Sequence, residues 1–133
     1  MPQGPVPERF HDLLNSKTLA HLSTIGPRGE PQVNPVWFLW DGEHILLSIR
    51  PVTQKYRNLR RDPRLAISLS DPARPERHLE IRGEVVDWTL FRDLTFVNQL
   101  AHKYTGADYT RGVPGEERYR VTVRIDSWHS CED

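Results

Sequence analysis

Residues 48–64, SIRPVTQKYRNLRRDPR, gather six basic side chains against a single acid, Asp62, in a chain whose formal net charge is zero. The basic side chains are Arg50, Lys55, Arg57, Arg60, Arg61 and Arg64. A phosphate or carboxylate is the ligand that such a cluster suits best, because charge-assisted hydrogen bonds are strong. A solvated basic helix without a ligand is the alternative interpretation.

The ends of this segment predict a helix that places its cations at an anion site. Pro51 ends the preceding strand, Thr53 is a good N-cap, and Asp62 stops the helix because it precedes a proline. The first turn then exposes free backbone N–H groups beside Lys55, and Arg50 arrives from the strand end. These features predict a pocket for a phosphate at the start of the helix.

Length and composition predict one domain. The chain has 133 residues, of which 37% are apolar, so we expect residues 1–9 to form a flexible arm and residues 10–133 a single domain. The 18 basic and 18 acidic residues balance, which argues against nonspecific binding to nucleic acid or membrane. No run approaches the roughly 20 apolar residues of a membrane span, and no targeting signal opens the chain, so we expect a cytoplasmic protein.

Hydrophobic periodicity predicts a mostly β protein with α elements. A short helix is expected near residues 7–16, the basic helix over 53–62, and a longer helix over 89–104. Alternating patterns predict six strands, at residues 18–25, 32–41, 44–50, 64–70, 78–88 and 118–128. Pro35 predicts a kinked or edge strand, and Gly83 a bulge or a close backbone approach. Six mostly hairpin-linked strands favour a small antiparallel barrel.

A family resemblance runs through the segment LSTIGPRGEPQVNPVWFLWDGEHILLSIRPVTQKYRNLRRDPRLAISLSD and the following EIRGEV. The order of these residues resembles the split β-barrel flavin and deazaflavin oxidoreductases of the pyridoxamine-phosphate-oxidase-like superfamily. The KYRNLRRDPR segment is most similar to the branch that uses the deazaflavin coenzyme F420. Over roughly residues 10–128, the resemblance implies a six-stranded antiparallel split barrel with flanking helices, of the FMN-binding type.

The resemblance also implies a homodimer with a cofactor groove between its subunits. By the family pattern, the residues that touch the cofactor ring along the second strand are Gln32, Asn34, Pro35, Val36 and Trp37. Those on the next strand are Ser48, Ile49 and Arg50. Those that hold the phosphate or the acidic tail are Thr53, Gln54, Lys55, Arg57 and Asn58, with the surplus Arg60, Arg61 and Arg64 as further candidates for the tail. The partner subunit would complete the groove with His78 and Glu80.

Simpler roles compete for some of these residues. Trp37 is equally compatible with a core tryptophan, and Asn34 with a side chain that satisfies backbone left open by Pro35. His78 could orient a substrate or donate a proton, although a surface histidine is the simpler interpretation. The six histidines show no metal-ligand spacing, and the single cysteine, Cys131, rules out a disulfide framework.

The resemblance implies an enzyme that transfers a hydride between reduced coenzyme F420 and an unsaturated small molecule. An FMN-binding oxidase or reductase on the same barrel is the alternative, since both cofactors carry a phosphate and a tricyclic ring. A non-enzymatic module that binds a cofactor or nucleic acid is the third hypothesis. Against nucleic acid stand the zero net charge and the scarcity of aromatics within the basic run. No catalytic side chain is assigned.

Overall fold

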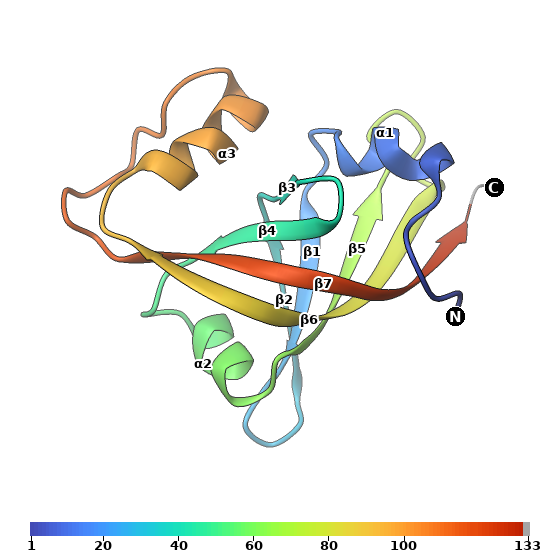
Figure 1. Cartoon of the computed structure of the whole chain (residues 1–133), viewed down its shortest axis with the longest axis horizontal. Helices are drawn as coiled ribbons and strands as arrows, with labels where there is room; N and C mark the ends of the chain where they lie inside the picture. The colour runs from blue at the N-terminus through green and yellow to red at the C-terminus, as the bar shows by residue number, and fades with distance from the viewer. Residues whose placement is uncertain (132–133) are drawn as a thin grey trace.

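The computed structural model describes residues 1–131 as one antiparallel sheet with short helices at its ends (Figure 1). The strands are β1 (Ala20–Ile25), β2 (Pro31–Val36), β3 (Leu39–Trp40), β4 (His44–Ile49), β5 (Arg64–Ser70), β6 (His78–Phe91) and β7 (Arg118–Cys131). The helices are η1 (Glu8–Phe10), α1 (His11–Leu14), α2 (Gln54–Arg61) and α3 (Thr95–Thr105). The strand order is β2-β1-β5-β6-β7-β4-β3.

The sheet curls because one continuous segment supplies both of its edges. β2 pairs with β1 at one edge, and β3, which follows after a break of two residues, pairs with β4 at the other. This closure makes the split barrel and confirms the predicted fold class. The predicted number of six strands is wrong, since the expected strand 32–41 divides into β2 and β3.

The break at Trp37 and Phe38 has a physical cause in α3. The Phe38 N–H donates to the Tyr104 hydroxyl at 3.3 Å, and the Phe38 carbonyl accepts from Lys103 Nζ at 2.8 Å. Because these backbone groups bond to helix side chains, they need no strand neighbour. Phe38 itself is fully buried in the core.

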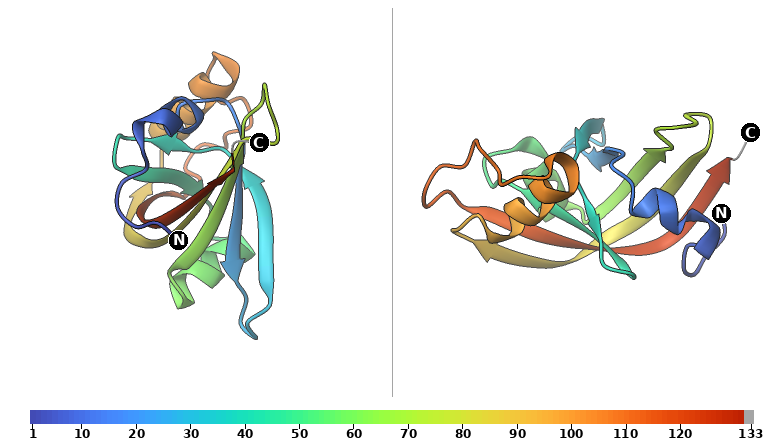
Figure 2. Two further views of the ribbon diagram at one scale, coloured as in Figure 1. Left: turned by 90° about the vertical axis from the view of Figure 1, so that its right-hand side faces the viewer. Right: turned by 90° about the horizontal axis from the view of Figure 1, so that it is seen from above.

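The core fills the inner face of the sheet, as the alternating patterns predicted. Buried side chains from five strands share this face, namely Leu22, Ile45, Leu47, Ile49, Leu65, Ile67, Leu69, Leu79, Ile81, Val121 and Val123. Phe10, Leu13 and Leu14 join the same core from η1 and α1, and Leu59 joins it from α2. Helices α1 and α2 therefore pack against the core of the curled sheet (Figures 1 and 2).

The long pair β6 and β7 confirms the predicted irregularity at Gly83. The register shifts between Arg82 and Gly83, and a Cβ on Gly83 would lie 2.0 Å from the Arg124 carbonyl oxygen. Only glycine therefore fits this close approach.

The start of the third helix was predicted wrongly. Residues 89–91 continue β6, because they pair with residues 118–120 of β7, and α3 begins only at Thr95. The Asp93 side chain accepts from the Thr95 N–H at 3.0 Å and marks that start.

The first residues of the chain contact the end of the sheet. Gln3 forms an isolated bridge with Ser127, and Val6 is buried in the core cluster. The division into an arm and one domain stays a prediction. Within residues 1–131, no helix is long and apolar enough to cross a membrane.

Candidate functional site

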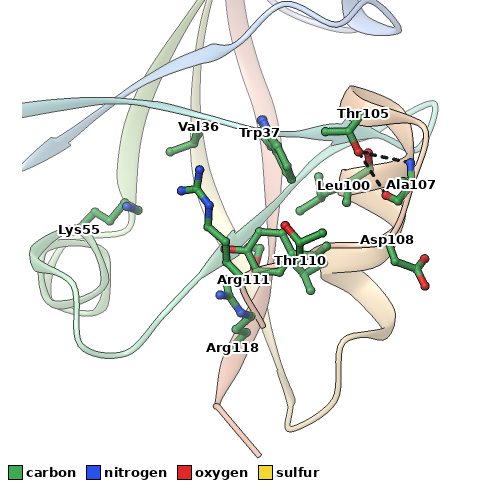
Figure 3. Close-up of a pocket in the computed structure, with 14 residues that line it drawn as sticks. Val36, Trp37, Lys55, Leu100, Thr105, Ala107, Asp108, Thr110, Arg111 and Arg118 are labelled. Carbon is green, nitrogen blue, oxygen red and sulfur yellow. Dashed lines mark hydrogen bonds between the residues drawn. The ribbon is translucent and has the colours of Figure 1, made fainter. Parts of the chain in front are cut away.

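A groove of about 660 Å³ lies between α3 with its following loop and the neighbouring ends of β2, β4 and β7 (Figure 3). The predicted cofactor residues that line it are Val36, Trp37, Ser48 and Lys55. The opposite wall is apolar and comes from Val97, Leu100 and Ala101 of α3. The loop adds Tyr109 and Arg111, and β7 adds Arg118.

The start of α2 forms as its sequence predicted. Thr53 is the N-cap: its hydroxyl accepts from the Tyr56 N–H at 3.3 Å and donates to the Arg50 carbonyl at 2.8 Å. The helix ends at Arg61, with Asp62 as its C-cap before Pro63. Local capping thus fixes the position of Lys55, which extends into the groove from the first turn (Figure 3).

Lys55 is a cation of the groove that lacks a counter-charge. It is half-buried, and burial lowers its pKa, with a smaller contribution from the positive charge of Arg50. Within residues 1–131, its ammonium has no carboxylate at ion-pair distance. A bound anion would restore the interactions that the ammonium loses on leaving water. This environment favours a phosphate or carboxylate beside Lys55.

Arg50 has a protein partner. Its Nε forms an ion pair with Glu116 in the loop before β7, and the other oxygen of Glu116 lies 3.5 Å from Arg118 Nη2. One carboxylate therefore serves two guanidinium groups. The predicted assignment of Arg50 to the cofactor would require it to share its charge with Glu116.

Asn58 and Gln32 hold α2 against the barrel. Asn58 is fully buried, and its amide donates to Thr24 Oγ1 at 3.0 Å and to Gln32 Oε1 at 3.1 Å. Its oxygen accepts from Gln54 Nε2 at 2.8 Å and from Arg61 Nη2 at 3.3 Å. Because both the donors and the acceptor of Asn58 are used within the protein, its role in this structure is to position α2. Gln32 and Gln54 belong to the same network.

The remaining predicted residues on β2, β4 and α2 do not line the groove. Ile49 is a core residue, 1% exposed. Pro35 lies on the exposed side of the edge strand β2, as its missing N–H predicted, and Asn34 is half-buried next to it. Arg57 is exposed and donates to Gln54 Oε1 at 2.8 Å. None of these four residues lines the groove described above.

The basic run does not form one continuous binding surface. The Arg60 guanidinium lies 4.0 Å from the centroid of the Trp88 ring and also packs over Tyr56 and Tyr119. Arg61 donates to the Ile25 carbonyl at 2.5 Å, and Arg64 pairs with Asp62 at 2.7 Å. These three arginines therefore have structural partners, which leaves Lys55 as the basic side chain of the run that faces the groove.

His78 and Glu80 lie at the other end of the sheet. His78 begins β6 and pairs with Cys131, whereas the groove end of β6 pairs with residues 118–120. The strand between them spans roughly 35 Å. Glu80 forms an ion pair with Arg82 at 3.2 Å. These two residues cannot reach the groove of their own chain, so their predicted role depends on a second subunit.

Sequence reasoning missed the wall that α3 and β7 contribute. Trp37 stacks on Tyr104 of α3, with ring centroids 5.1 Å apart, and meets the Tyr109 ring edge-on at 6.2 Å. Tyr104 also donates to the Thr18 carbonyl at 2.7 Å. The alternation in RYRVTV could have revealed Arg118 and Arg120, because both share the face of β7 opposite the core residue Val121.

The contacts of α3 with Phe38 predict a pH dependence of stability. Burial lowers the pKa of Lys103 to about 8 and raises the pKa of Tyr104 to about 12. An unfolded lysine keeps its proton to about pH 10.4, so between pH 8 and 10 this group makes the free energy of unfolding rise with pH. Above about pH 10, Tyr104 ionises in the unfolded chain before it ionises in the folded protein, so its contribution to the free energy of unfolding falls with pH.

Urea unfolding at pH 7.5, 9 and 10 checks this expectation. The difference in the free energy of unfolding between the wild type and Lys103→Met should be smallest at pH 7.5. The variant should also lack the increase in this free energy that Lys103 gives the wild type toward pH 10. A difference between the two proteins that stays constant with pH would contradict it.

Comparisons with known proteins agree with this architecture. A family model described as pyridoxamine 5'-phosphate oxidase matches residues 6–124. A solved structure named F420 Reductase is 36% identical, with a TM-score of 0.84, and the match covers 93% of this chain and 98% of that one. No match was found among curated proteins.

More distant structures share the fold. A conserved hypothetical protein from Mycobacterium tuberculosis is 24% identical, with a TM-score of 0.72 and coverage of 98% of this chain and 86% of that one. HupZ from Group A Streptococcus is 17% identical, with a TM-score of 0.67 and coverage of 95% and 94%. The family match spans most of the chain, and the chain belongs to the pyridoxamine 5'-phosphate oxidase family.

Proposed function

We propose that the protein is a coenzyme F420-dependent oxidoreductase that acts on an unsaturated small molecule. The observation that carries this proposal is the groove in which Lys55 lacks a counter-charge, on a fold shared with the F420 reductase. Proteins of this fold bind flavin or deazaflavin cofactors, and the capped helix α2 supplies the anion site that both cofactors need.

The residues of the groove fit a cofactor of this kind. A volume of about 660 Å³ accommodates a tricyclic ring, and Trp37 and Val36 offer it an apolar surface. Ser48 Oγ is buried without a hydrogen-bond partner and lies in the groove, so a polar ring atom would satisfy it. Lys55 and the free N–H groups of α2 would hold the phosphate.

Bound coenzyme F420 would supply hydride transfer, so no nucleophilic side chain or metal ion of the protein is required. The protein's own residues bind and orient. The Thr53 cap and the Asn58 network fix α2, and α2 fixes Lys55. The apolar face of α3 excludes water from the side of the groove where a substrate would lie.

Titration of the cofactor-free protein with coenzyme F420 and with FMN tests the proposal. Deazaflavin fluorescence or calorimetry should give a dissociation constant for coenzyme F420 at least tenfold below that for FMN. Tight binding of FMN with no binding of the deazaflavin would instead favour the FMN-dependent oxidase or reductase. No binding of either cofactor would leave the chain without this function.

We also propose that the protein is a homodimer. Trp37, Phe38 and Trp40 do not argue for it, because Phe38 is buried, Trp37 stacks on Tyr104, and Trp40 packs against the core. The support is that His78 and Glu80 can complete a groove only from a second chain. Val33 and Val52, which are 63% and 67% exposed, add unpartnered apolar surface near the groove strands.

Light scattering at micromolar concentration should therefore give twice the 15.5 kDa of one chain. Val52→Glu should shift the protein toward monomer if this surface is in the interface. A monomer for the wild type would contradict the dimer and remove His78 and Glu80 from the groove.

A further inference from the structure

Three of the four buried side-chain polar atoms without a hydrogen-bond partner in residues 1–131 lie close together. They are Ser48 Oγ, Arg118 Nε and Arg120 Nε. Ser48 of β4 is directly opposite Arg120 of β7, and Arg118 lies two residues along the same strand. Because side chains alternate along a strand, all three point to the outer face, away from Val121 and the core.

The charge at this cluster is not balanced by the protein. Glu116 is 3.5 Å from Arg118 but also pairs with Arg50. Within residues 1–131, Arg120 has no carboxylate at ion-pair distance, and its guanidinium carbon lies 5.7 Å from the centroid of the Phe91 ring. Buried polar groups in native proteins are normally paired, and an unpaired buried cation is expensive. An anion bound at this cluster would therefore satisfy Ser48 Oγ, Arg118 Nε and Arg120 Nε.

This cluster is separate from the anion site at α2. Lys55 enters the groove from α2, whereas Arg118 enters it from β7, below the apolar residues of α3 (Figure 3). The centroid of the Tyr109 ring lies 5.1 Å from the Arg118 guanidinium carbon, and Leu100 and Val97 line the same groove. A ligand here meets a cationic end and an apolar, partly aromatic body.

We propose that Arg118 and Arg120, which lie next to Ser48, bind the carboxylate of a substrate whose remaining body is flat and apolar. The proposal rests on the proposed function in one respect, that the cofactor occupies the side of the groove next to Lys55. The acidic group could instead belong to the cofactor. The substrate is favoured because α2 already offers the cofactor a phosphate site, and because the apolar wall of α3 lies beside Arg118.

Calorimetry with two matched probes tests the charge requirement. 2-Naphthoate carries a carboxylate on a flat apolar body, and 2-naphthamide has the same shape without the charge. Each is titrated into the protein alone and into the protein saturated with coenzyme F420. We expect 2-naphthoate to bind the saturated protein roughly tenfold to a hundredfold more tightly than the amide.

Two variants and one control locate the site. Arg118→Gln and Arg120→Gln should each reduce the preference for the acid over the amide by roughly tenfold. Their affinity for coenzyme F420 should change less than threefold. Arg92→Gln, an exposed arginine paired with Glu117 outside the groove, should change neither affinity.

A measurement on the ligand-free protein keeps the test independent of the probe. Arg120→Met should leave the thermal midpoint unchanged or raise it slightly, because it removes a buried Nε that has no hydrogen-bond partner. The same concentration of 2-naphthoate should stabilise the wild type more than this variant. A lower midpoint together with unchanged naphthoate binding would overturn the proposal.

The outcomes separate this inference from the proposed function. If coenzyme F420 binds but 2-naphthoate binds no better than the amide, or not at all at 10 mM, the substrate carboxylate is wrong. If Arg118→Gln and Arg120→Gln weaken the binding of coenzyme F420 as much as the binding of 2-naphthoate, the anion at this cluster belongs to the cofactor and the proposal fails. If naphthoate binds through the arginines while neither cofactor binds, the carboxylate site stands and the proposed function fails.

Discussion

Lys55→Ala is expected to weaken binding of coenzyme F420 by roughly tenfold to a hundredfold without loss of the fold. The wild-type ammonium is half-buried, and within the described chain no carboxylate balances it, so a bound phosphate gains a charge-assisted partner that water does not replace. Removal of the side chain takes away that partner. It leaves the Thr53 cap of α2 unchanged, because the cap uses the Tyr56 N–H and the Arg50 carbonyl.

The cofactor-free variant should be as stable as the wild type or slightly more stable, since it no longer buries an unpaired cation. Lys17→Ala, at an exposed lysine before β1, is the matched control and should leave the dissociation constant unchanged. Lys55→Arg should recover part of the affinity. Fluorescence titration gives the dissociation constants, and urea unfolding gives the stabilities.

An unchanged dissociation constant for Lys55→Ala would show that the lysine is not part of the cofactor site. A variant that no longer folds would show that it is structural. Burial lowers the pKa of Lys55, so its ammonium loses its proton at a lower pH than an exposed lysine. The affinity of the wild type for coenzyme F420 should therefore fall as the pH rises through the pKa of Lys55 in the cofactor-free protein, and Lys55→Ala should lose this dependence.

The sequence was sufficient to predict features that depend on local chemistry. The cap at Thr53 and the stop at Asp62 need only the residues within one turn, and both formed as expected. The inward faces of β4, β5 and β7 follow from alternation alone. The close backbone approach at Gly83 was also predicted correctly, because a glycine within a strand usually marks a bulge or such an approach.

Features that depend on distant partners were not predictable in this way. The break between β2 and β3 comes from Lys103 and Tyr104, which lie more than 60 residues away and bond to Phe38. The extension of β6 through residues 89–91 depends on pairing with β7. The local sequence pattern cannot detect either contact, because hydrogen bonds to a distant strand or side chain override the local secondary-structure propensity.

The basic run shows the same limit for the candidate site. Six cations in one segment predicted one anion-binding surface, but Arg60, Arg61 and Arg64 have aromatic, backbone and carboxylate partners. Besides Lys55, the buried Nε atoms of Arg118 and Arg120 lack a hydrogen-bond partner, and both residues were predicted only as part of a strand. Charge spacing along a chain therefore identified the helix, whereas the unsatisfied atoms of the structure identify the second site.

Asn58→Ala is expected to destabilise the protein by about 3 kcal/mol or more, which lowers the thermal midpoint by roughly 10 °C. The wild-type amide is fully buried and makes four hydrogen bonds, to Thr24 and Gln32 in the barrel and to Gln54 and Arg61 on α2. In Asn58→Ala these four partners lose their hydrogen bonds to the amide, in a buried site that water does not reach. Large losses of stability arise when a buried hydrogen-bond network is broken in this way.

Asn58→Ala should also weaken the binding of coenzyme F420, because α2 carries Lys55 and loses its hydrogen bonds to β1 and β2. Arg57→Ala, one residue earlier on the exposed side of the helix, is the matched control for stability and should stay within about 1 kcal/mol of the wild type. Asn58→Asp keeps an oxygen for Gln54 and Arg61, while Thr24 and Gln32 can turn donors toward it, so it should be less damaging than alanine. If alanine and aspartate are equally damaging, the site depends on volume and not on the network. If Asn58→Ala unfolds within about 2 °C of the wild type, the amide does not anchor α2, and the position of Lys55 must be set by the Thr53 cap alone.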